Sequence, residues 1–183
     1  MTKRVLVTTG ATFPFDDLVC AAFDDSVLRA LSAAGVTDLR VQYGSTATSA
    51  HLFRKLVSSN RELLDSLSIR VSGFATTDTM VKEITDAWVV ISHAGTGTIL
   101  DTLRVSRTPP ALIVVPNAML MHGHQAEVAN ALVAMKCLVS ADISVSYRQL
   151  ATAISSLKHV KMEKLPKRES LASVINYEAG VVG

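Results

Sequence analysis

Three short runs of the sequence are apolar at every residue, and they constrain the fold more than any other feature. They lie at residues 5–7, 88–91 and 112–115. A strand with one face in water alternates apolar with polar residues, so an unbroken apolar run of this length indicates a strand buried on both faces. Such strands are typical of a parallel sheet covered by helices on both sides. The sequence therefore predicts an α/β fold with a mainly parallel sheet.

Strand and helix patterns alternate along the rest of the chain. We predict strands over residues 4–8, 39–43, 69–72, 88–92, 112–115 and 137–139. Helices are predicted over residues 16–34, 47–58, 78–86, 98–105, 125–135 and 148–157, and Gly35 is placed to end the first of them. A charged connector at 161–167 leads to a last short helix near 169–177. The alternation predicts a single Rossmann-like domain with a mainly parallel sheet.

Length and charge exclude several classes of function. A chain of 183 residues suits one domain of ordinary size. Its formal net charge is +2, and no dense block of lysine and arginine is present, so we expect no nucleic-acid partner. The apolar run at the N-terminus is too short for a signal peptide, and no run approaches the ~18 apolar residues of a membrane-spanning helix. We therefore expect a cytoplasmic protein.

The loop after the strand at 88–92 is the strongest candidate for a binding site. It contains Gly95, Thr96, Gly97 and Thr98, followed by Asp101 one turn into the next helix. Small residues let backbone N–H groups approach a phosphate, and the helix N-terminus adds partial positive charge. A carboxylate at the position of Asp101 can accept hydrogen bonds from both hydroxyls of a ribose. The alternative is an ordinary strand-to-helix turn capped by a threonine.

Other loops at carboxyl ends of predicted strands carry further candidates. Gly10 and Thr12 follow the first strand and suit an anion, although a plain turn explains them equally well. Phe74 ends the third strand, where an aromatic ring can cover a planar base or simply pack in the core. A long loop ends at His124 and Gln125, and Gln125 can hydrogen-bond a sugar hydroxyl.

Several motifs of catalytic chemistry are missing from the sequence. There is no Asp-x-Asp motif for a metal-bound diphosphate and no Gly-x-Ser-x-Gly nucleophile motif. His122 and His124 lack an apparent third metal ligand. We therefore predict no metal site and no required cofactor, and the residue that acts as general base stays unknown.

Taken together, these segments resemble a known family. They occur in the order 7–15, 42–44, 73–74, 91–101 and 124–125. Over nearly its whole length the chain resembles the soluble catalytic subunits of eukaryotic UDP-N-acetylglucosamine transferases, which act in dolichol-linked oligosaccharide synthesis. More distantly, it resembles the C-terminal half of the bacterial N-acetylglucosaminyltransferase that makes lipid II.

The resemblance implies a half-enzyme. The fold would be the C-terminal domain of a GT-B glycosyltransferase, with residues 1–160 binding the donor nucleotide-sugar and residues 161–183 contacting a partner. A membrane-anchored subunit would supply the acceptor side in a heterodimer or larger complex. The pair would transfer GlcNAc from UDP-GlcNAc to GlcNAc-diphosphodolichol with inversion, on the cytosolic face of the endoplasmic reticulum.

The resemblance also implies roles for individual residues. The diphosphate would be bound by the loop that contains Gly95, Thr96, Gly97 and Thr98, and Asp101 would bind the ribose. Phe74 would contact the uracil, and His124 with Gln125 would contact the donor sugar. Gly10 and Thr12 would face the cleft, and His93 would contact phosphate. His93 is also a weak candidate for catalysis. Two other classes remain open: a stand-alone nucleotide-dependent Rossmann enzyme, and a non-catalytic regulator that binds a nucleotide-sugar.

Overall fold

The structure, a computed structural model, describes residues 2–10, 13–105, 109–116 and 132–158. In this part of the chain six strands form one sheet in the order β3-β2-β1-β4-β5-β6, with every pairing parallel. The strands are β1 (Arg4–Thr8), β2 (Asp38–Gln42), β3 (Arg70–Phe74), β4 (Val89–His93), β5 (Ala111–Val115) and β6 (Val139–Ser140). The predicted strands are therefore confirmed, with ends shifted by no more than two residues.

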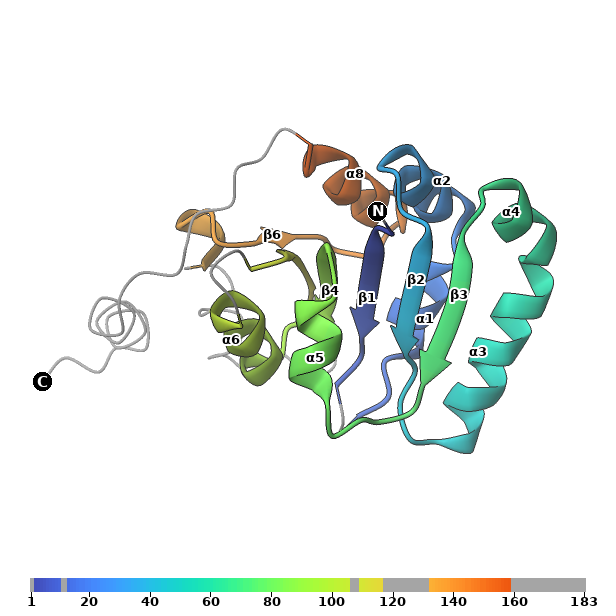
Figure 1. Cartoon of the computed structure of the whole chain (residues 1–183), viewed down its shortest axis with the longest axis horizontal. Helices are drawn as coiled ribbons and strands as arrows, with labels where there is room; N and C mark the ends of the chain where they lie inside the picture. The colour runs from blue at the N-terminus through green and yellow to red at the C-terminus, as the bar shows by residue number, and fades with distance from the viewer. Residues whose placement is uncertain (1, 11–12, 106–108, 117–131, 159–183) are drawn as a thin grey trace, which may run out of the picture.

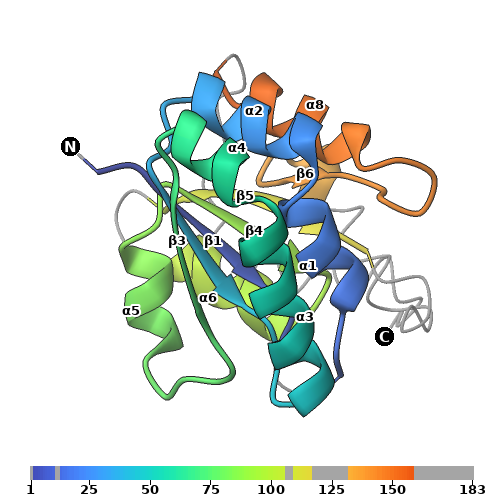
Figure 2. The same ribbon diagram turned by 90° about the vertical axis from the view of Figure 1, so that its right-hand side faces the viewer.

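Helices cover both faces of the sheet (Figure 1). One face carries α5 (Met80–Thr85) and α6 (Thr96–Arg104). The opposite face carries α1 (Asp16–Ala22), α2 (Asp25–Ala33), α3 (Ala47–Ser59), α4 (Arg61–Ser66) and α8 (Arg148–Ser156). Figure 2 shows the sheet between these two layers. This three-layer arrangement confirms the predicted Rossmann-like domain.

Strand β1 shows why the central runs are apolar at every residue. Val5 and Val7 belong to a hydrophobic cluster on one side of the sheet, and Leu6 belongs to a separate cluster on the other. All three side chains are completely buried. Burying a side chain of this size stabilises the fold by roughly 1.5–3 kcal/mol. The sheet thus divides two cores, and both depend on its central strands.

The helix predicted over residues 16–34 is wrong as a single element, because the structure has α1 and α2 there instead. Asp24 separates them as the N-cap of α2, and its carboxylate accepts a hydrogen bond from the backbone N–H of Ser26 at 2.9 Å. An N-cap aspartate satisfies a helix-start N–H that has no intrahelical partner, so it favours a new helix over a continuous one.

Gly35 ends α2 as predicted. Its φ is +80°, which glycine adopts without strain. Its N–H donates to the Ser32 carbonyl at 2.8 Å, and the N–H of Val36 donates to the Leu31 carbonyl at 3.0 Å. This pair of bonds is the Schellman motif, which satisfies the last carbonyls of a helix.

Other helix predictions differ in extent. Helix α4 was not predicted, and α6 begins at Thr96, two residues before the expected start. Most of the helix predicted over 125–135 lies outside the described residues, as do the connector at 161–167, the helix near 169–177 and the proposed domain boundary at 160. Within the described residues, no helix is long and apolar enough to cross a membrane.

Replacing Asp24 tests the break between α1 and α2. We expect Asp24→Ala to lower the free energy of unfolding by about 1 kcal/mol, because the Ser26 N–H loses its acceptor. Urea denaturation followed by circular dichroism measures this change. Asp25→Ala is the matched control, because Asp25 is exposed and pairs with Arg29 on the same helix, and its loss should cost less stability than the loss of the Asp24 cap. Equal losses for the two variants would contradict the capping role.

Candidate functional site

Buried polar side chains mark the carboxyl ends of β1, β2 and β4. Thr8, Thr9, Gln42 and Ser92 are all at most 2% exposed. The Thr8 hydroxyl donates to Oε1 of Gln42 at 2.5 Å, and the Thr9 hydroxyl donates to the Gln42 carbonyl at 3.2 Å. These bonds fix the ends of β1 and β2 side by side. We did not predict this pair from the sequence, although a polar residue ending an apolar strand was the available signal.

A second set of hydrogen bonds joins the helices that follow these strands. The hydroxyl of Ser49, at the start of α3, donates to Oδ1 of Asp16 at 2.7 Å, and Asp16 is the first residue of α1. Ser49 also accepts from the Thr46 hydroxyl at 2.8 Å, and Thr46 caps α3. The two helix starts are therefore held together beside the sheet edge where the loops open.

The imidazole of His93 lies between the loops that follow β1 and β4. A Cβ atom added to Gly10 would come within 2.6 Å of the ring, and one added to Gly95 would come within 2.4 Å of Nε2. Gly10 also has a φ of +82°, which disfavours a side chain independently. Both glycines therefore make room for His93. The contacts that we predicted between these two glycines and a ligand stay predictions. The position of the His93 ring is sufficient to explain why positions 10 and 95 have no side chain.

Burial favours the neutral form of the His93 imidazole. Desolvation lowers the pKa of its imidazole below the usual value, and the neighbouring Thr8 backbone offsets this only in part. Nδ1 is buried and has no hydrogen-bond partner among the described residues. A protonated ring would carry a donor at each nitrogen, and the one at Nδ1 would lack an acceptor here. The ring therefore fills the space between the two loops and packs closely against Gly10 and Gly95.

The first turn of α6 is open. Gly95 is its N-cap residue, and a glycine has no side chain with which to cap the helix. The first intrahelical bond runs from the Ile99 N–H to the Gly95 carbonyl at 3.1 Å, so the N–H groups of Thr96, Gly97 and Thr98 have no acceptor within the helix. A Cβ added to Gly97 would meet no atom within 4 Å. Free amides and the positive end of the helix dipole together suit an anion.

Residues 4–178 match the glycosyltransferase family 28 C-terminal domain. This match spans β1 to α8 and every element between them. The chain belongs to this family. The first turn of α6, which follows β4, therefore lies within the glycosyltransferase family 28 C-terminal domain.

Relatives with related names share much of the sequence. A UDP-N-acetylglucosamine transferase subunit ALG13 from Yarrowia lipolytica is 40% identical over 142 residues, which are 77% of this chain and 66% of the relative. The subunit of the same name from Eremothecium gossypii is 34% identical over 182 residues, covering 90% of this chain and 86% of the relative.

Solved structures agree with the fold. An NMR solution structure of ALG13 superposes with a TM-score of 0.70 at 27% identity, covering 96% of this chain and 94% of that one. The crystal structure of MurG from Acinetobacter baumannii superposes with a TM-score of 0.61 at 15% identity, covering 99% of this chain but only 48% of MurG. The family 28 domain described here thus has the fold of about half of MurG.

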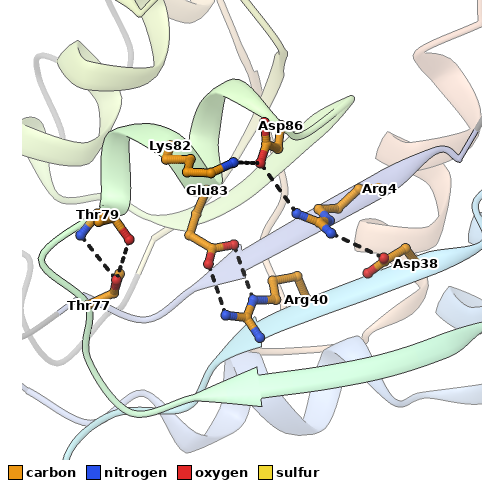
Figure 3. Close-up of polar contacts among 8 residues, drawn as sticks. All are labelled: Arg4, Asp38, Arg40, Thr77, Thr79, Lys82, Glu83 and Asp86. Carbon is orange, nitrogen blue, oxygen red and sulfur yellow. Dashed lines mark hydrogen bonds and ion pairs between the residues drawn. The ribbon is translucent and has the colours of Figure 1, made fainter.

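Phe74 has one contact that the sequence did not predict. The guanidinium of Arg40 lies over its ring, 4.5 Å from the centroid, and attraction between a cation and a ring favours this placement. Glu83 holds Arg40 with two hydrogen bonds of 2.9 and 3.1 Å (Figure 3). The half-buried ring also packs against the core beneath α5 and α6. The predicted contact with uracil stays a prediction, and it would have to use ring surface that Arg40 leaves open.

The remaining predicted site residues are Asp101, on the same helix as the open first turn, and three that lie outside the described residues. Asp101 is exposed on the second turn of α6. Thr12, His124 and Gln125 lie outside the described residues, and their predicted contacts stay predictions. Within the described part of the chain, no group of three His, Cys, Asp or Glu side chains can hold a metal ion. The expected lack of a metal requirement also stays a prediction.

The buried His93 predicts a dependence of stability on pH. The folded protein resists protonating this ring, whereas the unfolded chain binds a proton near pH 6.5, so the free energy of unfolding should fall as pH drops below that value. We expect His93→Gln to lose less stability than the wild type between pH 7.5 and 5.5 in urea denaturation. His51→Gln, which changes an exposed histidine, should keep the wild-type difference. A His93→Gln variant with that same difference would refute this role.

Proposed function

We propose that this chain is the donor-binding catalytic subunit of a split glycosyltransferase that transfers GlcNAc from UDP-GlcNAc. The observation that carries the proposal is the uncapped start of α6 at the carboxyl end of β4, in a chain of glycosyltransferase family 28. In parallel α/β sheets, ligands bind at this edge. The names of the ALG13 relatives support UDP-GlcNAc as the donor.

The proposed reaction is an inverting transfer to GlcNAc-diphosphodolichol, the second step of lipid-linked oligosaccharide assembly. A hydroxyl of the acceptor sugar attacks the anomeric carbon of the donor, and UDP leaves. The backbone N–H groups of Thr96, Gly97 and Thr98 stabilise the negative charge that grows on the leaving diphosphate. Asp101 binds the ribose hydroxyls in this proposal. The charge is met by fixed amide dipoles, so the step needs no metal.

The general base belongs to another chain in this proposal. His93 is a poor candidate, because its Nδ1 is buried and its ring is enclosed by Gly10 and Gly95. The carboxylate of Asp16 is engaged by Ser49. We therefore assign His93 a positioning role and place the base on the acceptor side.

A partner subunit completes the enzyme in this proposal. The ALG13 relatives are named subunits, which supports a complex with a second protein. We propose that this partner is anchored in the membrane, brings the chain to the cytosolic face of the endoplasmic reticulum and contacts residues 161–183. Residues 1–160 then form the donor-binding domain.

Gly97 offers a direct test of the diphosphate site. We expect Gly97→Leu to weaken UDP binding at least tenfold, because its side chain would project into the open space where the anion lies. Stability should stay unchanged or rise slightly, since leucine favours a helix more than glycine does and a Cβ there meets no neighbouring atom. Isothermal titration with UDP and thermal unfolding measure the two effects. Gly97→Ala is the conservative control, and wild-type affinity in Gly97→Leu would place the diphosphate elsewhere.

Transfer of labelled GlcNAc to a short-chain GlcNAc-diphospholipid tests the whole proposal. The assay compares the chain alone with the chain in membranes that carry its candidate partner. We expect product only in the presence of the partner. Product from the chain alone would favour a stand-alone enzyme, whereas UDP-GlcNAc binding without transfer in either sample would favour a non-catalytic regulator.

A further inference from the structure

A groove lies at the edge of the sheet far from the open end of α6. It runs between α3, α4 and the edge strand β3, with a volume of about 660 Å³. Figure 1 shows these three elements together at one side of the molecule, with α6 toward the other. Pockets of this size are typical of ligand and peptide sites. None of the residues that line the groove belongs to the candidate site described above.

The groove combines an apolar floor with a basic rim. Apolar side chains from both helices and from the strand line it, and they are Phe53, Val57, Leu64, Ile69 and Val71. Arg54, Arg61 and Arg70 stand around it and are exposed. Asp65 is the one acidic residue in the lining, so the rim carries an excess of two positive charges.

These three arginines differ from others in the described structure. Arg4, Arg29 and Arg40 each pair with a carboxylate. Within the described residues, no carboxylate pairs with the three arginines of the groove. Unpaired guanidinium groups around an apolar floor complement carboxylates that flank an apolar side chain.

The neighbouring strand adds a second feature. In the described sheet β3 pairs only with β2, so its outer edge has no strand beside it. The outer edge of such a strand presents backbone N–H and C=O groups that can pair with another extended chain. Peptides that add to an edge strand use these groups for affinity and nearby pockets for specificity.

We propose that this groove binds an extended acidic segment of a partner protein. The segment lies along β3 as an added strand, places an apolar side chain against Phe53 and Leu64, and aligns carboxylates with the arginine rim. The site is separate from donor binding, so it provides a docking surface for a protein rather than a part of the transfer chemistry. It therefore stands or falls independently of the proposed transferase function.

A peptide selection on the full-length chain tests this site. A library of random octapeptides is selected on the wild type, with counter-selection on the Arg54→Glu/Arg61→Glu variant. We expect the enriched peptides to alternate acidic with apolar residues and to bind the variant at least tenfold more weakly in fluorescence anisotropy. Lys55→Glu is the matched control, because Lys55 is exposed on α3 next to Arg54 but does not line the groove. It should bind as the wild type does.

Two further measurements make the outcome decisive. Backbone amide shifts of Val71 and Gly73 should change when the enriched peptide binds, while UDP affinity should stay the same in the variant. Arg61→Gln provides a milder change if the double reversal fails to fold. The proposal is overturned if no peptide depends on the arginines or if the enriched peptides lack acidic residues. Two rival occupants would also overturn the proposal. If the wild type self-associates and the charge reversal abolishes this, the groove binds a second copy of the chain. If the wild type binds anionic vesicles, the selected peptides do not displace them and the charge reversal abolishes this binding, the groove binds a lipid surface.

Discussion

The pairing of β1 with both β2 and β4 is the interaction on which the rest of the structure depends. Because β1 lies between them, its residues pack alternately into the two hydrophobic cores, with Val5 and Val7 on one side and Leu6 on the other. The chain also changes direction here. Connections lead from β1 toward β3 on one side and from β4 toward β6 on the other, so the helices that follow these two strands diverge from this point. The loops that follow β1 and β4, which contain Gly10 and Gly95, therefore lie next to each other, and His93 fills the space between the two glycines.

The sheet could be predicted from the sequence because its signal is local. An apolar run such as 112–115 has few explanations other than a strand buried on both faces, and it is β5 in the structure. The division of residues 16–34 into two helices also had a local signal, the Asp24-Asp25-Ser26 run. It was missed because the apolar spacing on either side of that run fits a continuous helix, and the capping bond of Asp24 outweighs that spacing.

The roles of the glycines could not be predicted, because they depend on neighbours in space. Gly95 and Gly97 are two residues apart in the same loop, and the sequence gives both the same interpretation. The structure separates them: a side chain at Gly95 would collide with His93, whereas one at Gly97 would enter open space. Small residues in a loop can therefore serve the protein's own packing or a ligand. Only the position of a histidine from the adjoining strand distinguishes the two cases here.

Charged groups are used in two different ways on this molecule. Between β1, β2 and α5, Arg4 contacts both Asp38 and Asp86, and Lys82 shares Asp86 (Figure 3). These cations are paired within the chain, and the pair between Arg4 and Asp86 links β1 to the end of α5. The arginines beside β3 have no such partners in the described residues, and the N-cap of α6 is a glycine, which has no capping side chain. Both cores are closed by the chain itself. Two sets of groups in the described residues are therefore suited to an anionic ligand, the amides in the first turn of α6 and the guanidinium groups beside β3.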